Sequence, residues 1–145
     1  MYKRILAALD GSPRTELVFS HAEQLARMHG AILHLCRAVN VPVGVPLEAW
    51  ALSGGELTEK LLEDGQSDLA ALRGRLSPPI VGENRVQIGR PAQVICELAD
   101  ELEVDLIVIG SHGFDALDRL IGTTAARVVN HAHCSVMVVR PPRSA

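Results

Sequence analysis

VDLIVIGSHGFDALDRLIGTTAARVVNHAHCSVMVV, residues 104–139, is the stretch that decides the fold. It begins with an almost continuous apolar run and ends with another, SVMVV. Such runs are typical of strands that are covered on both faces. Between them, TTAARVVNHA has the apolar spacing of a helix. A strand, a helix and a second strand in this order predict a unit of a parallel sheet.

The same alternation continues toward the N-terminus and predicts an α/β fold. Besides the two strands at 104–110 and 135–140, apolar runs predict strands at 3–10, 31–39 and 84–89. Helical spacing predicts helices at 13–29, with Ser12 as cap and Pro13 first, and at 56–76, 90–102 and 123–132. Residues 40–55, with two prolines and three glycines, predict an irregular connector.

These elements predict one domain over residues 1–145, an open five-stranded parallel sheet of order 3-2-1-4-5 with helices on both faces. Ligands of such sheets bind beyond the carboxyl ends of the strands, at the point where the strand order reverses. Here that point lies between the first and fourth strands. The sequence directly after these two strands is therefore expected to carry the function.

Composition excludes several classes of protein. The chain is 48% hydrophobic but only 3% aromatic, which predicts an aliphatic core. A net charge of −3 argues against a dedicated nucleic-acid binder. No run approaches the roughly 20 apolar residues of a membrane-spanning helix, and the N-terminus lacks the pattern of a signal peptide. We expect a cytoplasmic protein, in which Cys36, Cys96 and Cys134 are buried free thiols.

A glycine-rich loop follows the fourth strand. Gly110 ends that strand, Gly113 follows, and Gly122 precedes Thr123 and Thr124 at the start of a helix. Glycine lets a ligand approach the backbone, and a helix N-terminus offers free N–H groups and a positive dipole end. The pattern predicts a phosphate-binding loop. The alternative, a strand end and a helix cap without a ligand, stays open.

Three of the histidines are candidates for a function, one as a ligand contact and two as part of a weak metal-binding motif. His112 lies inside the glycine loop, where it could contact a phosphate or a ribose. The HAH motif, with His131 and His133, sits at a helix end and lacks a placed acidic or cysteine partner, which disfavours a metal site. No P-loop motif and no dinucleotide-binding fingerprint occur.

Three segments together resemble the single-domain universal stress proteins: KRILAALDGS (3–12), GRPAQVICELADELEVDLIVIGSHG (89–113) and LIGTTAARVVNHAHCSVMVVR (120–140). The resemblance covers almost the whole chain. It implies a Rossmann-like sheet of the adenine nucleotide alpha hydrolase-like kind. Many members bind ATP through a G-x2-G-x9-G-[ST] loop, and others lack the loop and do not. The loop here is G-x2-G-x8-G-T, one residue shorter.

The resemblance also implies ligands and roles for single residues. The ligand would be ATP, or AMP or ADP, with or without Mg²⁺. Asp10 matches an acid that contacts the ribose or adenine side, with helix capping as its alternative. Ala8, Ala38 and Ile109 would lie beside the base. The implied site consists of Ala8, Asp10, Ala38, Ile109, Gly110, His112, Gly113, Gly122, Thr123, Thr124 and Ala125.

Two functions remain open from the sequence. The first is a stress-response module whose nucleotide occupancy changes its choice of an unknown protein partner. The second is a nucleotide-free dimeric interaction protein. The sequence shows no clear lysine or arginine clamp and no placed catalytic base near the site, so we expect slow ATP hydrolysis at most. The last strand is an apolar edge, with Val136 and Val138 on one face, and predicts a homodimer through that edge.

Overall fold

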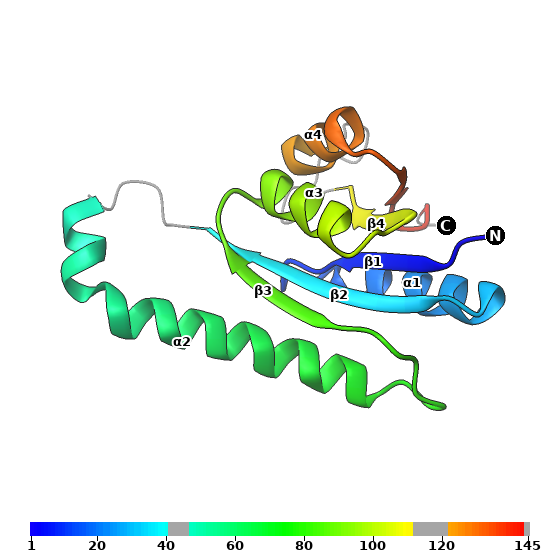
Figure 1. Ribbon diagram of the computed structural model, residues 1–145, viewed down its shortest axis with the longest axis horizontal. Helices are drawn as coiled ribbons and strands as arrows, with labels where there is room; N and C mark the ends of the chain where they lie inside the picture. The colour runs from blue at the N-terminus through cyan, green and yellow to red at the C-terminus, as the bar shows by residue number, and fades with distance from the viewer. Residues whose placement is uncertain (41–46, 112–121, 144–145) are drawn as a thin grey trace.

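The computed structural model describes residues 1–40, 47–111 and 122–143 (Figure 1). Strands and helices alternate along the described chain. The strands are β1 (Arg4–Ala8), β2 (Ile32–Val39), β3 (Asn84–Ile88), β4 (Leu106–Gly110) and β5 (Ser135–Val139). The helices are α1 (Thr15–His29), α2 (Leu47–Gly74), α3 (Pro91–Glu101) and α4 (Thr123–His131).

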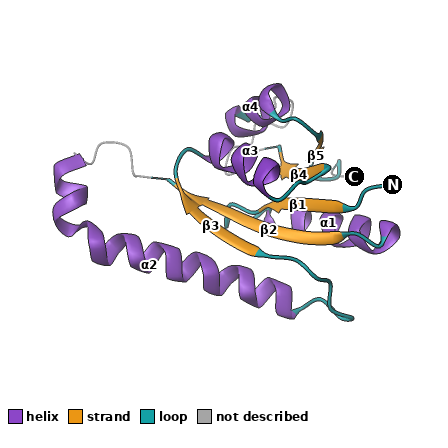
Figure 2. Cartoon of the chain, in the orientation of Figure 1, coloured by secondary structure: helices purple, strands orange, loops and turns teal. Residues whose placement is uncertain are grey.

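The five strands form one parallel sheet in the order β3-β2-β1-β4-β5, as predicted (Figure 2). β1 lies in the centre, paired with β2 on one side and with β4 on the other. Its Ile5 aligns with Leu106 of β4. The strand order therefore reverses between β1 and β4, and their carboxyl ends open at the same edge of the sheet.

Two hydrophobic layers cover the sheet. Successive residues of β1 point to opposite faces, so Ile5 and Ala7 pack under α1 and α2, whereas Leu6 and Ala8 pack under α3 and α4. Figure 1 shows α3 and α4 on one side of the sheet and α2 on the other. The core residues are mainly leucine, isoleucine, valine and alanine, as the scarcity of aromatic residues predicts.

Helix α2 is longer than expected, because part of the segment predicted as an irregular connector is helical. The helix begins at Leu47, so residues 47–55 are helical. The segment LEAWAL contains strong helix formers, which outweigh the two glycines that follow. The remainder, 41–46, lies outside the described residues.

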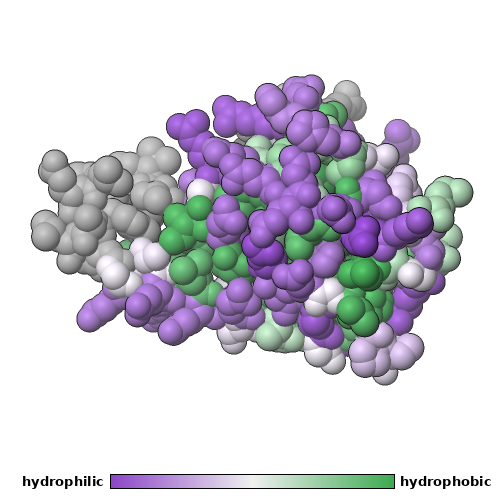
Figure 3. All heavy atoms as spheres, viewed as in Figure 1, coloured by the Kyte–Doolittle hydropathy of each residue, from purple (hydrophilic) through white to green (hydrophobic). Residues whose placement is uncertain are grey.

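No helix that the structure describes, α2 included, is long and apolar enough to span a membrane. Hydrophilic side chains dominate the face seen in Figure 3.

Helix α1 begins two residues later than predicted. Ser12 and Pro13 belong to a turn, and Arg14 precedes the first helical residue, Thr15. The Ser12 N–H donates to Asp10 Oδ1 at 2.9 Å, and the Arg14 N–H donates to Ser12 Oγ at 3.2 Å. These side chains satisfy backbone donors that would otherwise be free at the start of a helix, and they hold the chain in a turn.

The cysteines are buried to different extents. Cys36 is fully buried, whereas Cys96 and Cys134 are half-buried. The expectation of three buried thiols is therefore right for Cys36 and wrong for the other two. Cys96 lies on α3, and Cys134 comes directly before the edge strand β5, where less structure covers it.

Candidate functional site

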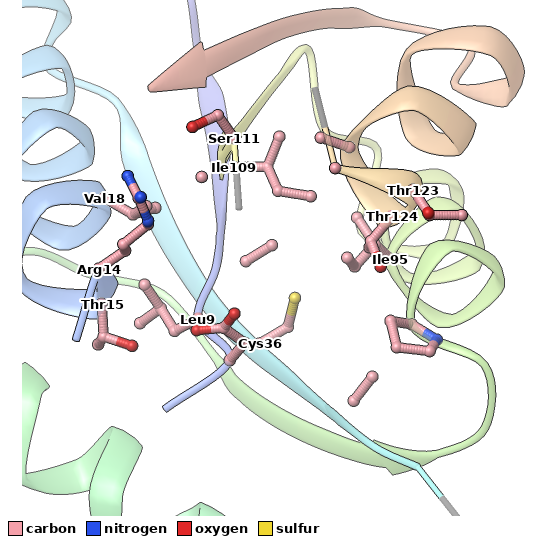
Figure 4. Close-up of a pocket in the computed structure, with 17 residues that line it drawn as sticks. Leu9, Arg14, Thr15, Val18, Cys36, Ile95, Ile109, Ser111, Thr123 and Thr124 are labelled. Atoms are coloured by element: carbon pink, nitrogen blue, oxygen red, sulfur yellow. The ribbon is translucent and has the colours of Figure 1, made fainter. Parts of the chain in front are cut away.

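A pocket of about 440 Å³ opens at the carboxyl ends of β1 and β4 (Figure 4). Its wall also includes the end of β2 and the starts of α1, α3 and α4. This volume lies within the usual range for small-molecule sites. The pocket therefore occupies the point of the sheet at which the topology favours ligand binding.

The pocket brings together most of the residues predicted from the sequence. Nine of the eleven line it: Ala8, Asp10, Ala38, Ile109, Gly110, Gly122, Thr123, Thr124 and Ala125. The other two, His112 and Gly113, lie outside the described residues. Five different elements or turns supply these nine residues, so their convergence is a consequence of the strand order.

One part of the pocket is lined by apolar side chains. Ala8 ends β1, and Ala38 is the last residue but one of the adjacent strand β2; both have small side chains and leave space above the sheet. Ile95 of α3 and Ile109 of β4 add apolar surface. Burial raises the pKa of the Cys36 thiol to about 12, so this pocket residue is neutral near pH 7 and unsuited to act as a nucleophile.

The start of α4 forms the polar part of the pocket. Gly122 is the N-terminal cap residue, with extended backbone angles, and no side chain of the described residues caps the helix. The first helical hydrogen bond joins the Ala126 N–H to the Gly122 carbonyl at 3.0 Å. The N–H groups of Thr123, Thr124 and Ala125 therefore have no acceptor within the helix. No acidic residue lies in this first turn, so the turn itself does not offset the positive end of the helix dipole, which faces the pocket.

A pair of backbone hydrogen bonds fixes the position of α4. The Gly122 N–H donates to the Ser111 carbonyl at 2.6 Å, and the Ser111 N–H donates to the Val139 carbonyl at 3.0 Å. Ser111 is buried. The start of α4 is thereby attached to the end of β4, which in turn is attached to β5.

The turn after β1 places Asp10 at the mouth of the pocket. Gly11 has a φ of +78°, a conformation that favours glycine, and its position lies against Arg37. Arg37 donates from Nε to the Leu9 carbonyl at 3.4 Å and from Nη1 to Asp68 at 2.7 Å. Arg37 therefore stabilises the turn through its hydrogen bond to the Leu9 carbonyl. Asp10 is exposed and lines the pocket.

Arg14 is a pocket residue that the sequence analysis missed. It lies at the start of α1, and its side chain lines the pocket (Figure 4). Its Nη1 atom is buried and has no hydrogen-bond partner among the described residues. The sequence analysis found no clear lysine or arginine clamp near the site, and the structure places this one arginine in the pocket. The available signal was position: Arg14 follows the first strand by one short turn, within reach of the switch point.

The HAH motif does not converge on a common point. His131 Nδ1 lies 2.8 Å from the Arg127 carbonyl, within its own helix. His133 Nδ1 lies 3.1 Å from Asp100 of α3. Across the described ranges, no three histidine, cysteine, aspartate or glutamate side chains are grouped as metal ligands.

Solved structures match this fold along most of the chain. The universal stress protein UspA from Lactobacillus plantarum has a TM-score of 0.83 at 26% identity, over 96% of this chain and 98% of that one. A universal stress protein in complex with cAMP has a TM-score of 0.64 at 24% identity, over 96% and 97%. One from Archaeoglobus fulgidus in complex with dAMP has a TM-score of 0.60 at 21% identity, over 96% and 98%. The last two show likeness of fold.

Sequence comparison assigns the family. A universal stress protein of Methanocaldococcus jannaschii is 34% identical over 148 residues, covering 99% of this chain and 85% of that protein. Universal stress protein A homolog 1 of Coxiella burnetii is 31% identical over 139 residues, covering 95% and 96%. Residues 1–140 match the model of the Universal stress protein family. Together with the strand order and the position of the pocket, these matches show that the chain belongs to the universal stress protein family.

Proposed function

We propose that this protein binds ATP, or AMP or ADP, in the pocket between β1 and β4 and acts as a stress-response regulatory module. One observation carries the proposal: a single pocket joins an apolar recess to a helix N-terminus that no described side chain caps. An adenine nucleotide has the matching division into an apolar flat base and an anionic phosphate chain.

Each part of the nucleotide has a suitable part of the pocket. The base would occupy the recess beside Ala8, Ala38 and Ile109. The ribose would lie near Asp10, whose carboxylate can accept hydrogen bonds from hydroxyl groups. The phosphates would accept hydrogen bonds from the free N–H groups at the start of α4. The complexes of two family members with cAMP and dAMP support this assignment, because both ligands are adenine nucleotides.

A regulatory role agrees better with the described pocket than catalysis does. Its ionisable side chains are Asp10, Arg14 and Cys36, and the last of these is protonated near neutral pH. Rapid hydrolysis needs a residue that positions water and several groups that neutralise phosphate charge. We therefore propose slow turnover at most, so that the bound nucleotide acts as a signal. Its occupancy would alter the surface offered to a protein partner in the cytoplasm.

The edge strand β5 supports assembly into a homodimer as part of this function. β5 ends the sheet, and its Val136, Met137 and Val138 remain half-buried rather than covered. An apolar edge of this kind favours pairing with another strand. A two-fold axis would pair β5 with β5 of a second copy and close the assembly.

Extraction of the purified protein tests the nucleotide assignment directly. Denatured protein should release a compound with the ultraviolet spectrum and mass of an adenine nucleotide, or stripped protein should bind ATP in a calorimetric titration with and without Mg²⁺. GTP serves as the control for base selectivity. A protein that releases nothing and takes up neither AMP, ADP nor ATP at millimolar concentration would favour the alternative, a nucleotide-free dimeric interaction protein.

A further inference from the structure

We infer that Arg14 is a specificity-determining residue, which makes the pocket select phosphorylated ligands over their uncharged counterparts. The inference rests on the proposed function for the identity of the base. The class of ligand group, a phosphate oxyanion, follows from the chemistry of the guanidinium. Arginine binds such groups through paired N–H donors.

Arg14 and the start of α4 occupy opposite walls of the same pocket. Figure 4 shows Arg14 on the α1 side, with Thr123 and Thr124 on the α4 side. The end of β4, with Ser111, lies between these walls. A phosphate chain that contacts the free N–H groups of α4 would extend toward the guanidinium. The two walls then supply different kinds of donor, neutral backbone groups on one side and a full positive charge on the other.

The hydrogen bonding of Arg14 indicates a missing partner. Two other partly buried arginines have well-defined acceptors: Arg37 pairs with Asp68 at 2.7 Å, and Arg73 binds Asn84 Oδ1 at 2.7 Å together with three backbone carbonyls. Arg14 Nη1 is buried without an acceptor among the described residues. Withdrawing a charged donor from water without a partner is unfavourable. An anionic ligand in the pocket would place negative charge beside the guanidinium and so reduce that cost.

The placement of Arg14 also argues against a purely structural role. Asp10, the acidic side chain of the same pocket, already accepts the Ser12 N–H through Oδ1. The turn before α1 is held by the Ser12 hydroxyl and carbonyl, which bind the backbone of Arg14 and Thr15 and do not involve the guanidinium. The side chain can therefore be changed while the turn keeps its hydrogen bonds.

Arg14→Met tests the inference, with Arg90→Met as matched control. Methionine keeps much of the apolar length and removes the charge. Arg90 is exposed and precedes the pocket residue Pro91, but it does not line the pocket. Arg90→Met therefore removes one positive charge from the protein, as Arg14→Met does, without changing the pocket lining. The probes are adenosine, AMP, ATP and inorganic tripolyphosphate, measured by calorimetry. We expect Arg14→Met to lower the affinity for ATP and for tripolyphosphate roughly ten- to a hundredfold. Its affinity for adenosine should fall less than about threefold. Arg90→Met should change each by less than about threefold.

A second readout separates ligand binding from folding. Arg14→Met should melt, without ligand, at the same temperature as the wild type or higher, because it removes a guanidinium whose buried Nη1 has no acceptor among the described residues. A structural arginine would instead lower the melting temperature of the free protein. Arg14→Lys should recover part of the ATP affinity, since lysine keeps the charge but not the planar fork.

The outcomes separate this inference from the proposed function. Equal losses for adenosine and ATP, or equal effects of Arg14→Met and Arg90→Met, would overturn the role of Arg14 while leaving adenine binding intact. Arg14-dependent binding of tripolyphosphate by a protein that ignores adenosine and AMP would support Arg14 and refute the adenine assignment. A wild type that binds none of the four probes would overturn both.

Discussion

The Gly122 N–H donates to the Ser111 carbonyl at 2.6 Å and joins the two ends of the glycine-rich loop. Gly122 thereby uses its own N–H within the protein, while the next three N–H groups have no acceptor within α4. Ser111 is also bonded to Val139, so the pocket, β4 and β5 form one continuous hydrogen-bonded unit. The start of α4 is therefore fixed to the sheet at the point where its strand order reverses.

Thr123→Pro should weaken ATP binding without unfolding α4. Proline is tolerated at the first helical position, and Gly122 has φ −60° and ψ 158°, which suit a residue before proline. The substitution removes the Thr123 N–H and hydroxyl from the pocket. Loss of hydrogen bonds to a charged phosphate should reduce affinity about tenfold or more. Calorimetric titration of ATP measures the change.

Thr123→Ala is the control, because it removes the hydroxyl and keeps the N–H. If the backbone donor matters, Thr123→Pro should bind ATP more weakly than Thr123→Ala. Equal affinities for the two variants, with circular dichroism showing intact helices, would argue against a phosphate at this N–H.

The sequence predicted the sheet because every strand carries its own local signal. Each of the five apolar runs is separated from the next by a helical pattern or a turn, and handedness rules restrict the order of the strands. The pocket residues followed from that order together with the family resemblance. Asp10 and Gly110 are far apart in the chain, yet Asp10 closely follows β1 and Gly110 ends β4, and the topology makes these two strands neighbours.

Two features escaped prediction for physical reasons. Residues 47–55 contain glycines and follow prolines, which locally favour a loop, whereas helix formers and continuity with the rest of α2 favour the helix. Arg14 escaped because no periodicity shows where a long flexible side chain points. Its role depends on the turn set by Asp10 and Ser12, which delays α1 and leaves Arg14 beside the pocket.

Substitution by alanine at two glycines of α2 should change the stability of the protein in opposite directions. A Cβ at Gly55 would meet no atom within 4 Å, whereas one at Gly65 would lie 2.9 Å from Val86 Cγ1. Gly55→Ala should raise the free energy of unfolding by about 0.5–1 kcal/mol through helix propensity. Gly65→Ala should be less stable than Gly55→Ala by roughly 1–3 kcal/mol, because it overpacks α2 against β3. Urea denaturation measures both values.

Val86→Ala provides the check on the cause of that difference. In the Val86→Ala background, the obstructing methyl groups are absent, so Gly65→Ala should become neutral or stabilising relative to its own parent. A Gly65→Ala penalty of the same size in both backgrounds would show that crowding against Val86 is not responsible.

Stability should fall between pH 7 and pH 5 because of His34. This residue is buried, and its Nδ1 accepts the Glu83 N–H at 3.0 Å. Desolvation by burial lowers the pKa of His34. The negative charge of Glu83 raises this pKa but does not offset the desolvation, and the positive charges of Arg73, Arg4 and Arg85 lower it further. The unfolded chain therefore takes up the proton at higher pH than the folded protein does. The neutral form is stabilising above about pH 6.5, and that stability is lost as the pH falls toward the lower folded value.

His34→Gln isolates this contribution, since glutamine has a hydrogen-bond acceptor but does not titrate. The unfolding midpoint in urea should fall less for His34→Gln than for the wild type when both are compared at pH 7.5 and pH 5.5. The exposed histidines are common to both proteins, so their effects cancel in the comparison. Parallel pH profiles would exclude His34 as the cause.

Val138→Pro should convert a β5-mediated dimer into a folded monomer. The Val139 carbonyl accepts the Ser111 N–H, so the peptide groups of Val139 face β4. Backbone groups of successive strand residues point to alternate sides, and the Val138 N–H therefore faces the open edge of the sheet. Proline at 138 removes that donor and places a ring at the edge, where proline is tolerated within a single sheet.

Met137→Pro is the complementary variant, because Met137 pairs in register with Val108 and its N–H faces β4. It should destabilise the fold itself, whereas Val138→Pro should melt near the wild-type temperature. Sedimentation velocity should then show a dimer for the wild type and a monomer for Val138→Pro. A Val138→Pro protein that is folded and still dimeric would place the interface away from β5, since an antiparallel β5 pair cannot form its full ladder without that N–H.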